Sequence, residues 1–157
     1  MERGSESVPL SRLNVPYPLK LGHKGTGRMF MTQKTSVLLV GLLPERANLS
    51  SFPGLTVEKL KAGLDAAIEE LRTQGFEAAF SGIPPEAEPA EATVVADLAR
   101  LTPDVVIIGA GVRTVPEHFL LFERLINLVH RQAPQARIGF NTRPDDTVQA
   151  VQRWARR

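Results

Sequence analysis

The stretch that decides the fold is PDVVIIG, which occupies residues 103–109. Its four central residues are apolar and β-branched, and a glycine follows them, which is typical of a β-strand covered on both faces. A second run of this kind, VLLVG at residues 37–41, lies between polar and turn-forming residues. Two continuous apolar runs of this length favour a parallel sheet that is buried between helices.

Outward from these two runs, strand and helix patterns alternate four times. The strands are expected at residues 37–41, 76–81, 105–109 and 137–140, and the helices at 57–74, 91–101, 116–131 and 145–156. Thr56 is the expected N-cap of the first helix, and Gly75 is its expected stop. Four βα units in succession predict a parallel sheet with right-handed crossovers and strand order 2-1-3-4. The predicted fold class is therefore α/β, a single domain over residues 34–157 with helices on both faces of a four-stranded sheet.

Residues 1–33 differ in composition from the rest of the chain. They combine Gly, Pro, Ser and basic residues without a sustained period, so we expect a flexible basic leader. Met31 stands shortly before the first strand, and a second interpretation is that this methionine is the natural start and the leader is a misassigned extension. Both interpretations stay open at this point.

Composition excludes several classes of function. There is no cysteine, which rules out disulfides, thiolate metal sites and cysteine nucleophiles, and no apolar run approaches the roughly 18 residues of a membrane span. Residues 1–30 carry five Lys or Arg against two Asp or Glu, whereas residues 31–157 carry 14 against 15. Because the basic character belongs to the leader, we expect a cytoplasmic protein that binds neither membranes nor nucleic acid.

The order of the elements resembles that of flavodoxin-like (Rossmann-like) folds, in which ligands bind at the switch between the first and third strands. A long loop, residues 42–54, follows the first strand there. The usual chemistries of the fold find no support. Residues 41–45 read GLLPE, with neither the acidic cluster of a receiver domain nor the phosphate loop of a flavodoxin, and residues 109–111 read GAG, without a phosphorylated aspartate. Thr114 also replaces the third glycine of a dinucleotide motif. The cofactor stays unknown: flavin and NAD are not supported.

Four residues near the strand ends are candidates for ligand binding: Gly109, Gly111, Arg113 and Asn141. Arg113 stands just before an expected helix start, where backbone N–H groups and a guanidinium fork favour an anion. Each candidate also has an explanation without a ligand. In that explanation the two glycines serve only to let the chain turn, and Asn141 forms an Asx turn. Arg113 is then a solvated loop charge or a partner of Glu45. The adjacent acids at residues 145–146 are explained by the dipole of a helix start, so no metal is expected.

His118 is the candidate for catalysis. It falls at the centre of the apolar arc of the helix 116–131, an arc that also includes Phe119, so its ring is expected to point inward beside the strand ends. There it is a candidate general acid or base together with Glu45. The alternative is a core histidine bonded to a loop carbonyl. Leu120 lies on the polar side of the same helix, and a homodimer would cover both this leucine and the edge strand 137–140.

Three hypotheses follow for the function. The first is a domain that binds a small anionic molecule in a crevice formed by residues 43–54 and 109–113, His118 and Asn141. The second is a small cytoplasmic enzyme, a lyase, isomerase or hydrolase, with His118 as acid/base beside Glu45 and with Arg113 as the anion clamp. The third is a homodimeric interaction module without a ligand. The sequence identifies neither the ligand nor whether there is catalysis.

Overall fold

The computed structural model describes residues 32–155, and a four-stranded, all-parallel sheet forms the centre of this part of the chain. The strands are β1 (Ser36–Leu42), β2 (Glu77–Ile83), β3 (Val105–Ile108) and β4 (Arg137–Phe140). Their order in the sheet is β2-β1-β3-β4. The predicted sheet and its flavodoxin-like topology are therefore confirmed. The leader expected at residues 1–33 lies outside the described residues, except for Thr32 and Gln33.

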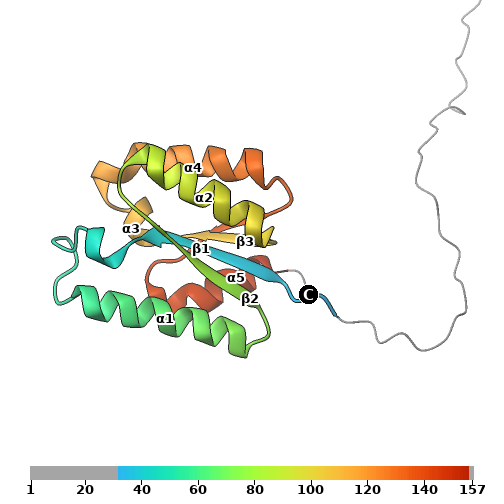
Figure 1. Cartoon of the computed structure of the whole chain (residues 1–157). Coiled ribbons are helices and arrows are strands. Elements are labelled where there is room, and N and C mark those ends of the chain that lie inside the picture. Colours follow the sequence, from blue (N-terminus) through green and yellow to red (C-terminus); the bar gives the residue numbers. More distant parts are fainter. Residues whose placement is uncertain (1–31, 156–157) are drawn as a thin grey trace, which may run out of the picture. The chain divides into compact units, whose positions relative to one another are not determined.

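Helices cover both faces of the sheet (Figure 1). One face carries α2 (Ala87–Leu101), α4 (Phe119–Gln132) and the short α3 (Ala110–Arg113), and the other carries α1 (Val57–Thr73) and α5 (Thr147–Trp154). Three 3-10 turns each begin with a proline: η1 (Pro44–Arg46), η2 (Pro116–His118) and η3 (Pro144–Asp146). Among residues 32–155, no helix is long and apolar enough to cross a bilayer.

The core is divided into two layers by the alternation of side chains along each strand. In β1, all of whose residues are buried, Leu38 and Val40 pack toward α2 and α4, while Val37 and Leu39 pack toward α1 and α5. This explains the continuous apolar run in the sequence, because a central strand with helices on both faces has no side exposed to solvent.

Both ends of α1 agree with the sequence. The hydroxyl of Thr56 accepts a hydrogen bond from the amide of Lys59 at 3.2 Å, as an N-cap does. After the helix, Gly75 adopts a φ of +91°, a conformation that glycine reaches without steric cost. Thr56 begins α1, and the first turns of this helix line the crevice described below.

Two helical regions differ from the expected ones. α2 begins at Ala87 instead of residue 91, because Pro89 occupies its first turn, where the missing N–H is not needed. The region after β3, which we expected to be a loop up to residue 115, contains the helix α3, and the next helix begins as the 3-10 turn η2. Phe119, expected in the apolar arc, is 63% exposed. It lies one residue, or about 100°, beyond His118 and so at the edge of that arc.

A crevice at the carboxyl ends of the strands

A crevice of about 570 Å³ lies beyond the carboxyl ends of β1 and β3, on the side of the sheet that α1 covers. Its walls are residues 47–55 of the loop between β1 and α1, the first turns of α1, residues 109–111, and residues 141–145. The chain leaves β1 toward α1 on one face and leaves β3 toward α3 and α4 on the other. This divergence opens a gap between the two loops at the point where ligands bind in open α/β sheets.

One wall of the crevice is apolar. It is built from the β1–α1 loop and the inner side of α1, and its side chains are Ala47, Leu49, Phe52, Leu55, Leu60 and Leu64. The loop is shaped by two short turns, in which the amide of Phe52 donates to the carbonyl of Leu49 at 2.9 Å and the amide of Leu55 donates to that of Phe52 at 3.1 Å. A wall of this kind can contact an apolar part of a ligand over a large area.

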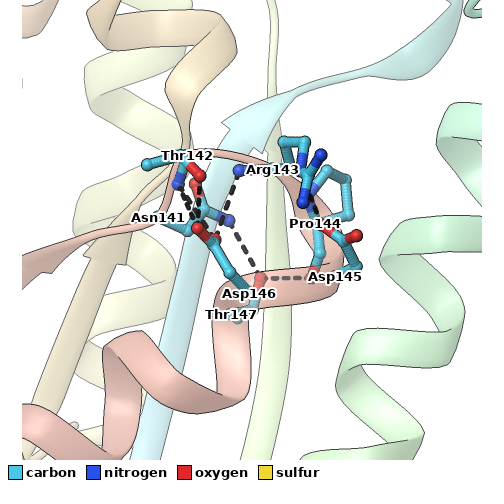
Figure 2. Close-up of polar contacts among 7 residues, drawn as sticks. All are labelled: Asn141, Thr142, Arg143, Pro144, Asp145, Asp146 and Thr147. Atoms are coloured by element: carbon cyan, nitrogen blue, oxygen red, sulfur yellow. Dashed lines mark hydrogen bonds and ion pairs between the residues drawn. The ribbon is translucent and has the colours of Figure 1, made fainter.

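The opposite wall is polar and cross-linked, as Figure 2 shows for residues 141–147. Asn141 is 3% exposed, and both the oxygen and the nitrogen of its side-chain amide form hydrogen bonds. Its oxygen accepts from the backbone N–H of Ala110 at 3.0 Å, and its nitrogen donates to the hydroxyl of Thr147 at 2.9 Å. That hydroxyl donates onward to the carbonyl of Pro144 at 2.7 Å. Asn141 thus ties the end of β4 to the starts of α3 and α5, which is a longer-range role than the Asx turn considered above.

The carboxylate of Asp146 organises the remainder of this wall. It accepts from the backbone N–H of Thr142 at 2.9 Å, from the hydroxyl of the same residue, and from the N–H of Arg143 at 3.2 Å. Partial burial alone would raise the pKa of Asp146, but these hydrogen bonds together outweigh the burial and lower the pKa below its ordinary value. The hydrogen bonds therefore favour the charged form of the carboxylate, which connects residues 142 and 143 to the start of α5.

The floor of the crevice is the backbone of residues 109–111. The amide of Gly109 donates to the carbonyl of Val40 at 2.8 Å, and a Cβ on this glycine would lie 3.3 Å from the same oxygen. Gly109 therefore allows the close approach of β3 to β1, as one of the alternatives above requires. Two residues further on, the carbonyl of Gly111 accepts from Nδ1 of His118 at 3.0 Å. Because a carbonyl can only accept, Nδ1 must carry the proton.

The predicted site residues divide into two groups. Gly109, Gly111 and Asn141 line the crevice, whereas Glu45, Arg113 and His118 do not. His118 is 8% exposed and bonded to the carbonyl of Gly111, which corresponds to the alternative to catalysis except that this carbonyl lies in α3 and not in a loop. Glu45 is exposed on η1, and no hydrogen bond or ion pair between described residues connects it to His118.

Arg113 lies behind the polar wall. Its terminal nitrogen donates to the carbonyl of Asn141 at 3.0 Å, and its guanidinium lies over the ring of Phe140, 5.7 Å from the centroid. The Nε atom is buried and has no hydrogen-bond partner in the described part of the chain. Arg113 is therefore neither a solvated loop charge nor a partner of Glu45 here, and these contacts are with the last residue of β4 and the residue that follows it.

The charged side chains that line the crevice are Lys59, Arg143 and Asp145. The ammonium of Lys59 donates to the carbonyl of Gly54 at 3.1 Å, and Arg143 pairs with Asp145 at 3.1 Å. The Arg143 and Asp145 side chains are 74% and 70% exposed, so their attraction is weak and either charge is free to interact with another ion. The lining carries one net positive charge.

Sequence reasoning missed the contribution of α1 to this crevice. The available signal was Gly63, a glycine in the middle of a helical pattern, which usually has a packing reason. A Cβ at this position would lie 3.3 Å from Cβ of Pro144, so Gly63 lets α1 approach the polar wall. Lys59 and Arg143 carry no such signal, because charged residues at a helix start and in a loop are common on any surface.

Carboxylate side chains are few around the crevice. Asp145 is the only carboxylate that lines the crevice, and no cluster of three or more His, Cys, Asp or Glu side chains occurs within residues 32–155.

Comparison of the chain with models of protein families, with curated proteins and with solved structures finds no significant match in any of the three.

Proposed function

We propose that this chain is a binding domain for a small amphipathic anion, which occupies the crevice at the strand ends. The observation that carries the proposal is the crevice itself, about 570 Å³ in volume, with one apolar wall and one ordered polar wall. This volume lies within the range of roughly 300–1,000 Å³ that is typical of small-molecule sites, which are also mostly apolar with a few polar groups at fixed positions.

The charges on the rim favour an anion over a cation. Lys59 and Arg143 both line the crevice, and Asp145, the one carboxylate among the described lining residues, is paired with Arg143. A ligand whose apolar body lies against Phe52 and Leu60 would place an anionic group within reach of these two cations. The sequence-based expectation of a small anion is kept, but Lys59 and Arg143 replace Arg113 as the groups that recognise the charge.

The test uses two fluorescent probes with the same aromatic body, 1-anilinonaphthalene-8-sulfonate and its uncharged parent N-phenyl-1-naphthylamine. Each is titrated into the full chain, and the dissociation constant is measured from the fluorescence. We expect the sulfonate to bind more tightly than the neutral probe. The double variant Lys59→Gln/Arg143→Gln should weaken the sulfonate roughly twofold to thirtyfold, because each exposed ion pair contributes about 0.2–1 kcal/mol, and should leave the neutral probe unchanged.

Two matched controls locate the probe. Arg100→Gln removes an arginine that is also paired on the surface, with Asp97, but lies outside the crevice, and should change neither constant. Phe52→Ser removes an apolar contact from the crevice wall, whereas Leu120→Ser removes a 67% exposed leucine elsewhere. The proposal requires that Phe52→Ser weaken both probes and that Leu120→Ser weaken neither. If Leu120→Ser abolishes binding and Phe52→Ser does not, the probes occupy the exposed surface and the proposal is wrong.

A cytoplasmic location and a homodimer belong to the same proposal. The location is supported by the absence of cysteine from the sequence. The dimer is supported by the exposed side chains of Phe119 and Leu120 and by the edge strand β4. A dimer predicts a melting temperature that rises with protein concentration, and a constant melting temperature over a hundredfold range would contradict it.

A further inference from the structure

Four glycines line the crevice, and packing accounts for three of them. A Cβ at Gly41 would lie 3.2 Å from the ring of Phe80, one at Gly63 would lie 3.3 Å from Pro144, and one at Gly109 would lie 3.3 Å from the carbonyl of Val40. Each of these glycines allows two segments of the protein to approach closely, so packing explains why a residue without a side chain stands there.

Gly111 has no such cause. A Cβ built on it meets no atom within 4 Å, and its φ is not positive, because among the described glycines only Gly54 and Gly75 have positive φ. It lies in the helix α3, where alanine is favoured over glycine. Neither packing nor backbone conformation therefore requires a glycine here, although the residue lines the crevice.

The backbone around Gly111 is also held by two side chains from other elements. The preceding residue, Ala110, donates its N–H to the buried amide of Asn141, and the carbonyl of Gly111 accepts from the buried ring of His118. Two of the residues singled out in the sequence thus act on the same short segment. Together they present a bare stretch of backbone to the crevice in a fixed position.

We propose that Gly111 is a specificity-determining contact of the ligand site, at which the apolar body of the amphipathic anion packs directly on the backbone. This inference rests on the proposed function and adds to it which part of the ligand contacts which residue. A Cβ at position 111 would have open space around it, at a residue that lines the crevice, so in this scheme a methyl group there competes with the ligand for that space. Asn141 and His118 are positioning residues in this scheme, since they hold the segment and do not touch the ligand.

The test compares Gly111→Ala with Gly139→Ala in the full chain, with the dissociation constant of 1-anilinonaphthalene-8-sulfonate and the melting temperature measured for both. Gly139 lies on β4 outside the crevice, and a Cβ there would lie 2.7 Å from the Trp154 ring. We expect Gly111→Ala to weaken the probe at least fivefold while the melting temperature stays equal or rises. Gly139→Ala should lower the melting temperature. At temperatures below its unfolding transition, the dissociation constant of the probe should equal that of the wild type.

Three outcomes decide the matter. If Gly111→Ala binds the probe as tightly as the wild type, while Phe52→Ser weakens it, the crevice binds the ligand but Gly111 is not a contact, and only this inference is overturned. If Gly111→Ala lowers the melting temperature, the glycine has a structural cause and the inference is overturned as well. If Phe52→Ser leaves wild-type binding intact, the proposed function itself fails, independently of Gly111.

Discussion

Replacement of Asn141 by alanine is expected to destabilise the protein by about 2–4 kcal/mol. The variant loses two hydrogen bonds of a buried amide, at 3.0 Å to the N–H of Ala110 and at 2.9 Å to the hydroxyl of Thr147. A typical hydrogen bond contributes about 0.5–1.5 kcal/mol net, and a buried donor left without a partner costs about 1–3 kcal/mol. The N–H of Ala110 becomes such a donor, and because its bond to Asn141 is only partly buried, the lower part of that cost applies to it.

The measurement is urea unfolding at equilibrium, with Asn127→Ala as the control. Asn127 makes a single hydrogen bond, to the carbonyl of Glu123, on the exposed side of α4, so its replacement should be neutral or slightly stabilising. A double-mutant cycle of Asn141→Ala with Thr147→Val should show a coupling of at least about 0.5 kcal/mol, since both variants break the same link. Stability of Asn141→Ala within about 0.5 kcal/mol of the wild type, or additivity in the cycle, would refute the assignment of Asn141 as the residue that holds this wall.

Three further predictions concern stability. Gly139→Ala should lower the unfolding free energy by about 1–3 kcal/mol, because a Cβ would lie 2.7 Å from the ring of Trp154, and a value near zero in urea unfolding would contradict this close contact. His118→Ala should lower the melting temperature, because it removes the bond to Gly111; an unchanged melting temperature would instead favour the catalytic hypothesis. Asp146 has a lowered pKa in the folded protein, so its contribution to stability is full well above its ordinary value of 3.8 and is lost as the pH falls through the lower folded value. The stability difference between the wild type and Asp146→Asn, followed by urea unfolding from pH 6 to pH 2, should therefore shrink below about pH 4, and a difference that does not change with pH would exclude this linkage.

The binding hypothesis and the enzyme hypothesis differ in what they require of His118. The binding hypothesis needs the ring as a donor to Gly111, with Nδ1 protonated and buried. The enzyme hypothesis needs the ring at the reacting atoms together with Glu45, yet neither side chain lines the crevice. His118→Asn is informative here, because an amide nitrogen can replace Nδ1 as a donor but cannot replace imidazole as a general base. Recovery of stability with this variant would support the binding hypothesis.

The sheet was accessible from the sequence because its signal is local and repeated. Each strand is a short apolar run, each helix has a stripe of period 3.6, and four alternations of the two leave few topologies that obey right-handed crossovers. The strand order β2-β1-β3-β4 and the ends of α1 at Thr56 and Gly75 follow from these patterns and from cap chemistry. The helix α3 was missed, because four residues are too few to establish a period.

The sequence by itself determined which residues stand at the strand ends, but only the tertiary structure decided which of them reach the crevice. Gly109, Gly111 and Asn141 line it. Arg113 instead packs on Phe140, and the ring of His118 bonds to the carbonyl of Gly111 without lining the crevice. The physical reason is that the direction of a side chain in a short irregular segment is set by its partners across the sheet. The carbonyl of Asn141 is 28 residues from Arg113 in the chain, and Gly63 of α1 meets Pro144 across an even longer separation. Such pairings arise only when β1, β3 and β4 lie side by side, and no pattern within one segment contains them.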